Sequence, residues 1–210
     1  MGRKYNFYAG PATLPYSVLE QIQEEIVDYN NEGLSIIETS HRSAMYDHIH
    51  NETADLIREL LGVPKDYHIL FLGGGATLQF GMIPMNLLGA NKSCDFIVSG
   101  SWAQKAIKDA KLYGNVNVIY DGSDNSYTSL PDPEAVEVND DTVYLHLTSN
   151  ETIGGVQWQQ FPTPSGVPVV ADMSSDILSR PINVEDFGMI YAGAQKNIGP
   201  AGVTVVIIKD

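Results

Sequence analysis

Apolar residues recur along the chain at two spacings, one typical of helices and the other of buried strands. Helices are predicted at positions 18–29, 49–61, 76–88 and 102 to about 113, and Gly62 is a plausible end for the second. The short apolar runs rich in β-branched residues that indicate strands are 67–72, 94–99, 116–120, 142–147, 168–171, 188–192 and 203–208.

Strands that are apolar on both faces and separated by helices indicate an α/β fold, with a mostly parallel sheet flanked by helices on each side. Ligands of such sheets bind beyond the carboxyl ends of the strands. We therefore expect the functional residues directly after strands. The segment 121–133, which is rich in Ser, Asp, Gly and Pro, is expected to be a surface connection.

Composition narrows the class of protein. With 43% hydrophobic and 18% charged residues, a chain of 210 residues is able to bury one α/β core. A formal charge of −14 argues against a nucleic-acid or anionic-membrane surface. An anionic substrate would have to bind to a few specifically positioned cationic side chains. The chain has only four guanidinium groups, those of Arg3, Arg42, Arg58 and Arg180.

The single cysteine, Cys94, excludes an intrachain disulfide and favours a reducing compartment. No signal peptide or membrane-spanning run is recognisable, so we expect a cytoplasmic protein. We expect no metal site, because the histidines do not gather and the rings of His48 and His50 point to different helix faces.

Glycines and an aromatic residue mark two predicted strand ends. Gly73–Gly75 lie between a strand and a helix, where free N–H groups would favour a phosphate, although a tight turn explains them equally well. A Rossmann fingerprint fits badly, since Leu78 occupies its last glycine position, and no Walker sequence follows. Trp102 begins the next helix, where it would either stack on a planar ring or belong to the core or surface.

Polar residues gather at two further strand ends. In the segment HLTSNET at 146–152, the Ser, Asn and Thr residues would either form a turn or hydrogen-bond a ligand oxygen. Asp172 closes a strand, where a carboxylate serves to bind a metal, orient a histidine, pair with a protonated ring nitrogen or cap a helix.

Lys196 lies among small residues between two apolar strands. Poor solvation there would lower its pKa and make its amine a nucleophile for carbonyls, whereas an exposed loop lysine would have neither property. Together, a phosphate cradle, a ring stacker, a strand-end aspartate and a desolvated lysine are the protein groups that pyridoxal 5'-phosphate requires. An NAD or metal site requires no such lysine.

The motifs at these positions, in this order, closely resemble those of the phosphoserine aminotransferases, which are class-V aminotransferases of fold-type I. They are GGGAT at 73–77, SW at 101–102, TSNET at 148–152, ADMSS at 171–175 and GAQKNIGPAG at 193–202. NFYAGPATLP at 6–15 and SHRS at 40–43 belong to the same pattern, and the likeness runs along the whole chain.

The resemblance implies a role for each matching position. Lys196 would be the catalytic lysine that carries the cofactor as a Schiff base, and Asp172 would pair with the ring nitrogen. The other implied cofactor-binding residues are Trp102 against the ring, Thr152 at its phenolic oxygen, and Ala76, Thr77 and Gln195 at the phosphate. His41 and Arg42 would bind the anionic side-chain end of the substrate.

The implied reaction is transamination between L-glutamate and 3-phosphohydroxypyruvate, which gives 2-oxoglutarate and phosphoserine for serine biosynthesis. The resemblance also allows the phosphohydroxythreonine step of pyridoxine biosynthesis, and it implies a cytoplasmic homodimer. We expect residues 1–15 to form an N-terminal segment and 16–210 the cofactor-binding large domain.

The sequence departs from the family in length. Members carry a small C-terminal domain, a carboxylate-binding arginine and an Asn-Thr pair that this chain lacks, and some have arginine at the position of Thr77. We therefore expect these 210 residues alone to transaminate poorly or not at all.

Two rival interpretations stay open. The first is another class-V enzyme, such as a cysteine desulfurase or an alanine–glyoxylate-type aminotransferase, although Cys94 is poorly placed for a desulfurase. The second is a non-catalytic binding module that has kept the fold.

Overall fold

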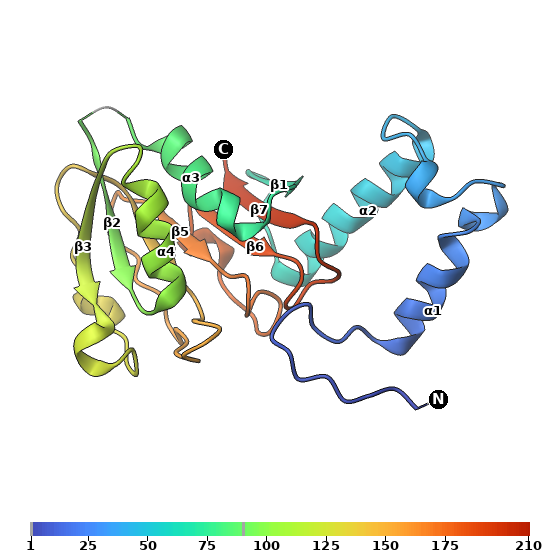
Figure 1. Cartoon of the computed structure of the whole chain (residues 1–210). Coiled ribbons are helices and arrows are strands. Elements are labelled where there is room, and N and C mark those ends of the chain that lie inside the picture. Colours follow the sequence, from blue (N-terminus) through green and yellow to red (C-terminus); the bar gives the residue numbers. More distant parts are fainter. Residues whose placement is uncertain (1, 90) are drawn as a thin grey trace.

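The computed structural model describes residues 2–89 and 91–210, which form a layered α/β body with a helical arm (Figure 1). Its helices are α1 (Tyr16–Glu25), α2 (Ala44–Leu61), α3 (Gly75–Leu87) and α4 (Ser101–Ala110). Short 3-10 turns lie between elements at η1 (Tyr29–Asn31), η2 (Ile36–Glu38), η3 (Gly122–Asn125), η4 (Pro133–Ala135) and η5 (Val184–Asp186). α1 ends earlier than predicted, and α2 ends at Gly62, which takes the left-handed conformation expected of a glycine cap.

Seven strands form one sheet in the order β1-β7-β6-β5-β4-β2-β3. They are β1 (Tyr67–Leu72), β2 (Ser93–Val98), β3 (Asn115–Asp121), β4 (Thr142–Thr148), β5 (Val169–Asp172), β6 (Met189–Gly193) and β7 (Thr204–Lys209). Neighbouring strands from β3 to β6 pair in parallel, whereas β7 runs antiparallel to both β6 and β1. The predicted mostly parallel sheet is thus confirmed, with one reversed strand.

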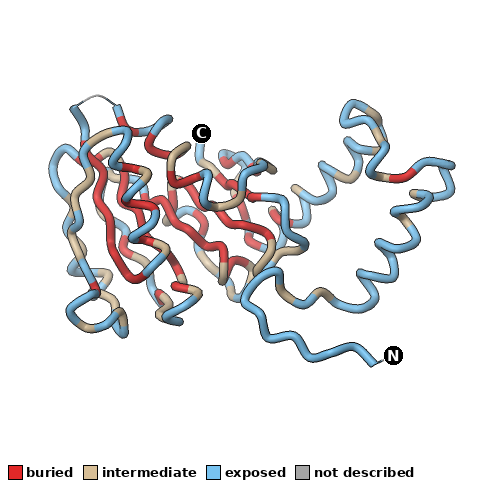
Figure 2. The backbone as a smooth tube through the Cα atoms, viewed as in Figure 1, coloured by how far each residue is buried: buried red, intermediate tan, exposed pale blue. Residues whose placement is uncertain are grey.

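The sheet has a buried core on each face. On one face, α3 and α4 cover Phe96, Tyr144, Val170 and Tyr191 (Figure 1). On the other, the end of α2 and several loop residues, among them Trp158, pack on the strands. Strands β2, β4, β5 and β6 are therefore buried through most of their length (Figure 2), which explains their continuous apolar runs, whereas the edge strand β3 has no buried residue.

An arm built from α1 and the first half of α2 extends from the sheet (Figures 1 and 2). The predicted apolar face of α1 exists, but none of its residues is buried, and Val18 and Ile22 are 40% and 39% exposed. Among the described residues, no helix combines the length and apolarity needed to cross a membrane.

Candidate cofactor site at the carboxyl edge of the sheet

The carboxyl ends of β4, β5 and β6 and the first turn of α4 meet at one edge of the sheet, as the strand-end rule predicts. The connection from β6 to β7, residues 194–203, lies at the same edge because β7 returns antiparallel. It carries Lys196. The backbone N–H of Ala194 donates to the carbonyl of Val203 at 2.9 Å, so both ends of this connection are tied to paired strands.

Lys196 is partly buried and points toward two of the predicted cofactor residues. Its Nζ donates a hydrogen bond to Thr152 Oγ1 and lies 4.9 Å from the centroid of the Trp102 ring. Burial lowers the pKa of Lys196, and the charge of Asp172 opposes that shift. A lysine with a lowered pKa presents more neutral amine near neutral pH, which is the nucleophilic form.

Trp102 occupies the first turn of α4 and forms a wall of the site. Its indole Nε1 is buried and has no hydrogen-bond partner among the described residues. The ammonium group of Lys105 lies 4.1 Å from the centroid of the same ring. The ammonium group of Lys196 therefore lies over the electron-rich face of this ring.

Asp172 ends β5 and is only 4% exposed. Its Oδ1 accepts hydrogen bonds from the backbone N–H of Ser174 at 2.9 Å and from the Ser174 hydroxyl at 2.6 Å. That hydroxyl also accepts from the N–H of Gly193 at 3.0 Å, which links the ends of β5 and β6. Burial raises the pKa of Asp172, while the Ser174 hydrogen bonds and the charge of Lys196 oppose the shift.

Two buried polar residues near Asp172 were given no individual role by the sequence. His146 Nε2 lies 2.9 Å from the hydroxyl of Tyr191, and its ring stacks on Phe96 with centroids 4.4 Å apart. Tyr191 pairs in register with Asp172, whose charge adds to the effect of burial in raising the tyrosine pKa. Complete burial lowers the pKa of His146 to about 3. The only sequence signal was a histidine inside an apolar strand.

The predicted phosphate-binding positions lie on two segments. Gly74 and Gly75 take positive φ values of 88° and 69° and open α3, whose N-terminus has no side-chain cap. Ala76 and Thr77 follow in its first turn, where backbone N–H groups lack helical partners and favour an anion. Gln195 precedes Lys196, and the structure shows no hydrogen bond between the described side chains of these two segments.

A methyl group at Gly193 would lie 2.7 Å from Gln195 Oε1, so the amide of Gln195 folds back over that strand end. The N-terminal segment is a further neighbour that the sequence did not predict. The N–H of Ala12 donates to the carbonyl of Gln195 at 2.8 Å, and a Cβ at Gly10 would lie 3.1 Å from Lys196 Cγ. Glycine at position 10 allows this close approach.

The structure does not bring His41 and Arg42 to this group. Both are exposed and lie on the arm, immediately before α2. The only interaction of Arg42 found among the described residues is the hydrogen bond from its backbone N–H to Ser40 Oγ, at 3.2 Å.

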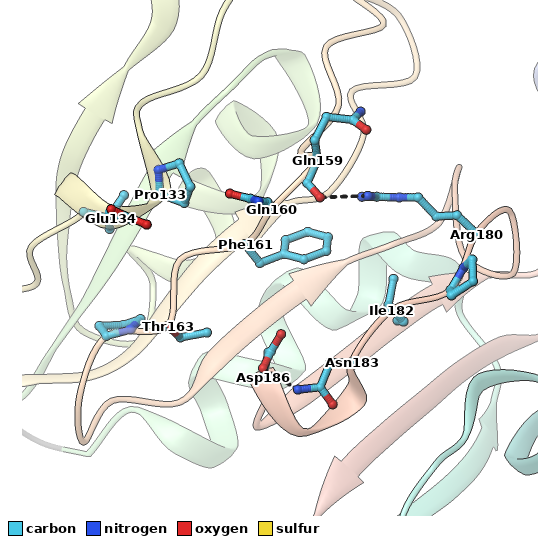
Figure 3. A pocket seen from close by; sticks show the side chains of 13 residues that line it. Pro133, Glu134, Gln159, Gln160, Phe161, Thr163, Arg180, Ile182, Asn183 and Asp186 are labelled. Carbon is cyan, nitrogen blue, oxygen red and sulfur yellow. Dashed lines mark hydrogen bonds between the residues drawn. The ribbon is translucent and has the colours of Figure 1, made fainter.

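A separate open cavity of about 760 Å³ lies away from the predicted site (Figure 3). None of the predicted cofactor residues lines it, and its lining includes Phe161 and Arg180. The guanidinium of Arg180 donates to the backbone carbonyls of Gln159, at 3.1 Å, and Trp158. The Arg180 guanidinium therefore already binds backbone carbonyls, so this cavity offers little to an anionic ligand.

The residues at the sheet edge fit pyridoxal phosphate. They combine a lysine of lowered pKa, a buried carboxylate near it, an indole face beside the lysine and an uncapped, glycine-opened helix N-terminus. Each of these is a group that the cofactor requires from a protein.

Known proteins resemble this chain over nearly all of its length. A phosphoserine aminotransferase of Lysinibacillus sphaericus is 51% identical over 207 residues, which are 99% of this chain and 57% of that relative. The solved phosphoserine aminotransferase from Bacillus circulans subsp. alkalophilus superposes with a TM-score of 0.96 at 52% identity, over 99% of this chain and 57% of that one. This likeness confirms the predicted fold class. The chain thus spans a little over half the length of these relatives.

A more distant solved relative is the phosphoserine aminotransferase from Trichomonas vaginalis, whose structure is described as bound to PLP. It shares 40% identity and a TM-score of 0.91, over 99% of this chain and 62% of that one. The profile of the family described as "Aminotransferase class-V" matches residues 4–210. The chain therefore belongs to the class-V aminotransferases.

Proposed function

We propose that the protein to which this chain belongs is a pyridoxal-phosphate-dependent aminotransferase. It would transfer an amino group from L-glutamate to 3-phosphohydroxypyruvate, giving 2-oxoglutarate and phosphoserine. The observation that carries this proposal is the meeting of Lys196, Trp102, Thr152 and Asp172 at one sheet edge. Its substrates are proposed from the 51% and 52% identity to proteins described as phosphoserine aminotransferases.

When bound, pyridoxal phosphate supplies a carbonyl that exchanges amino groups and a ring that withdraws electrons from the substrate. Lys196 would hold the cofactor through Nζ, and its lowered pKa favours the amine form that bonds to a carbonyl. Once released by the substrate's amino group, the same Nζ would take a proton from the substrate carbon and return it. The Thr152 hydroxyl orients Nζ for both roles.

Asp172 would hold the ring nitrogen, where a carboxylate favours the protonated form. The hydrogen bonds from Ser174 keep this carboxylate in place. Trp102 would stack on the ring and exclude water from one side. Ala76, Thr77 and Gln195 would bind the phosphate, with the N-terminus of α3 adding its dipole.

His41 and Arg42 would bind the anionic end of the substrate, as the family pattern suggests. Because both lie on the exposed arm, within one chain they make no contact with the Lys196 group. A homodimer would supply the missing contact, and it would also cover the apolar face of α1. We propose a homodimer on this ground. We also propose that the protein acts in the cytoplasm, in serine biosynthesis. The division into an N-terminal segment 1–15 and a large domain 16–210 stays a prediction.

The decisive experiment is turnover by the purified full-length protein with glutamate as donor, comparing phosphohydroxypyruvate with pyruvate and glyoxylate as acceptors. We expect the protein to prefer the phosphorylated acceptor. The Arg42→Ala variant should lose much more of this preference than the control variant Arg180→Ala. Equal or better turnover of glyoxylate or pyruvate would favour the rival class-V activity. Failure to bind pyridoxal phosphate at all would contradict the enzyme assignment itself.

A further inference from the structure

Glu151 is a buried carboxylate directly beside the proposed site. It is 1% exposed, yet its side chain accepts three hydrogen bonds. Its Oε2 accepts from the backbone N–H of Trp102 at 3.1 Å, and its Oε1 accepts from the N–H of Ala103 at 3.2 Å. The hydroxyl of Ser99 donates to Oε1 at 3.3 Å. All three partners are donors, which suits a carboxylate.

The first turn of α4 depends on this distant side chain. The residue at the N-cap, Gly100, has no side chain to offer, and α4 has no other side-chain cap. Backbone N–H groups in the first turn of a helix need partners from elsewhere, and a negative charge there is favoured by the helix dipole. A Cβ at position 100 would lie 2.6 Å from Glu151 Cδ, so glycine leaves the room that the carboxylate occupies.

The same residue is tied to the lysine side of the site. Glu151 immediately precedes Thr152, whose hydroxyl accepts from Lys196 Nζ. The backbone of Glu151 is held by its N–H to Val156 at 2.9 Å and by its carbonyl, which accepts from Gly155 at 2.6 Å. One residue therefore links the helix that carries the indole with the loop that orients the lysine.

We propose that Glu151 is a positioning residue for the cofactor, and that it acts by fixing the Trp102 indole at the height and angle needed to stack on the pyridine ring. Glu151 itself touches the helix backbone and not the ring. This inference rests on the proposed pyridoxal-phosphate site.

A double-mutant cycle separates positioning from general stabilisation. The four proteins are the wild type, Glu151→Gln, Trp102→Leu and the double variant. The readouts are the dissociation constant for pyridoxal phosphate, from titration of its visible absorption, and the visible circular dichroism of the bound cofactor. Ser99→Ala is the matched control, because Ser99 donates to the same carboxylate but leaves both helix hydrogen bonds in place.

We expect Glu151→Gln to weaken cofactor binding about tenfold and to change the circular dichroism, because the amide turns a donor toward a backbone N–H and breaks a charge-assisted bond. In the Trp102→Leu background the same substitution should weaken binding less than about twofold, because no indole remains to be positioned. Ser99→Ala should bind the cofactor as the wild type does.

Equal weakening by Glu151→Gln in both backgrounds would overturn the inference and leave Glu151 a purely structural residue. Wild-type protein that binds no cofactor would instead sink the proposed function, so the two failures are distinguishable. Should Glu151→Gln not fold, Glu151→Asp keeps the charge, withdraws the carboxylate by one methylene group, and is measured in the same cycle.

Discussion

The ammonium nitrogen of Lys196 lies 4.9 Å from the centre of the Trp102 ring, so the proposed attachment atom faces the proposed stacking surface. Lys105, on α4, lies still closer to the same ring, at 4.1 Å. Proximity to the indole therefore does not single out Lys196. What distinguishes it is partial burial, with the Thr152 hydroxyl as its partner.

The first prediction uses these two lysines as a matched pair. After borohydride reduction of the cofactor-loaded protein, the pyridoxyl group should remain on the peptide that contains Lys196. Lys196→Ala should lose both this label and the visible absorption band, while Lys105→Ala should keep both. Peptide mass spectrometry checks the outcome, and a label on the Lys105 peptide in the wild type would exclude Lys196 as the attachment site.

The second prediction concerns the Trp102 ring. Stacked aromatic pairs contribute about 0.5–1.5 kcal/mol beyond their buried area. Trp102→Leu should therefore weaken pyridoxal-phosphate binding by about tenfold, and Trp102→Phe, which keeps a ring, should weaken it less. Both variants should still be labelled at Lys196 at saturating cofactor. Equal losses for leucine and phenylalanine would show that stacking is not the role of this residue.

The third prediction concerns the energetic cost of Asp172. Because burial raises its pKa, keeping it ionised near neutral pH costs folding free energy. In cofactor-free protein, Asp172→Asn should raise the free energy of unfolding at pH 7–8, and the Tm with it. The asparagine keeps an oxygen for Ser174.

The sign of the pH dependence follows from the raised pKa. As the pH falls through the folded-state pKa, the wild-type carboxyl takes up a proton, so the advantage of Asp172→Asn should shrink and vanish. Thermal unfolding as a function of pH tests this. A variant that melts below the wild type at pH 8 would mean that the attraction between Asp172 and Lys196 outweighs the cost of burial.

The fourth prediction concerns acid stability. His146 has a folded-state pKa of about 3, far below its usual value, because it is buried. Between pH 6.5 and about 3 the unfolded state binds this proton and the folded state does not, so stability should fall with pH by up to about 1.4 kcal/mol per unit from this group. His146→Gln, which keeps a partner for Tyr191, should remove that share of the slope. His48→Gln, on the exposed arm, is the control and should leave the slope unchanged.

Much of the sheet could be predicted from the sequence because burial on both faces leaves a plain signal. The apolar run at 67–72 became β1, and the others became strands within a residue or two. The direction of β7 could not be predicted, since an apolar run is the same whichever way it lies. The apolar stripe of α1 predicted a helix, but such a stripe does not indicate which surface packs against it. Within the described residues nothing buries the α1 stripe.

The candidate site shows the same limit. Lys196 and Asp172 stood out because each followed a strand, and resemblance assigned the remaining positions. Burial of Lys196 depends on partners such as Thr152, which only the fold brings near. Tyr191 and Glu151 were given no individual role, because their hydrogen bonds reach residues on other strands and helices and no local pattern marks such contacts.

The reversed strand β7 also has a consequence for the order of folding. Among the described strands β1 pairs only with β7, and a hydrogen bond beside this pairing joins His68 to Asp210, 142 residues apart. Closing so long a loop is slow, because its entropy is lost before the strand pairing repays it. On the ribosome, β1 would leave the exit tunnel early and then wait, with its apolar edge unpaired, until the chain as far as β7 had been made. Chaperone demand during synthesis should therefore centre on β1.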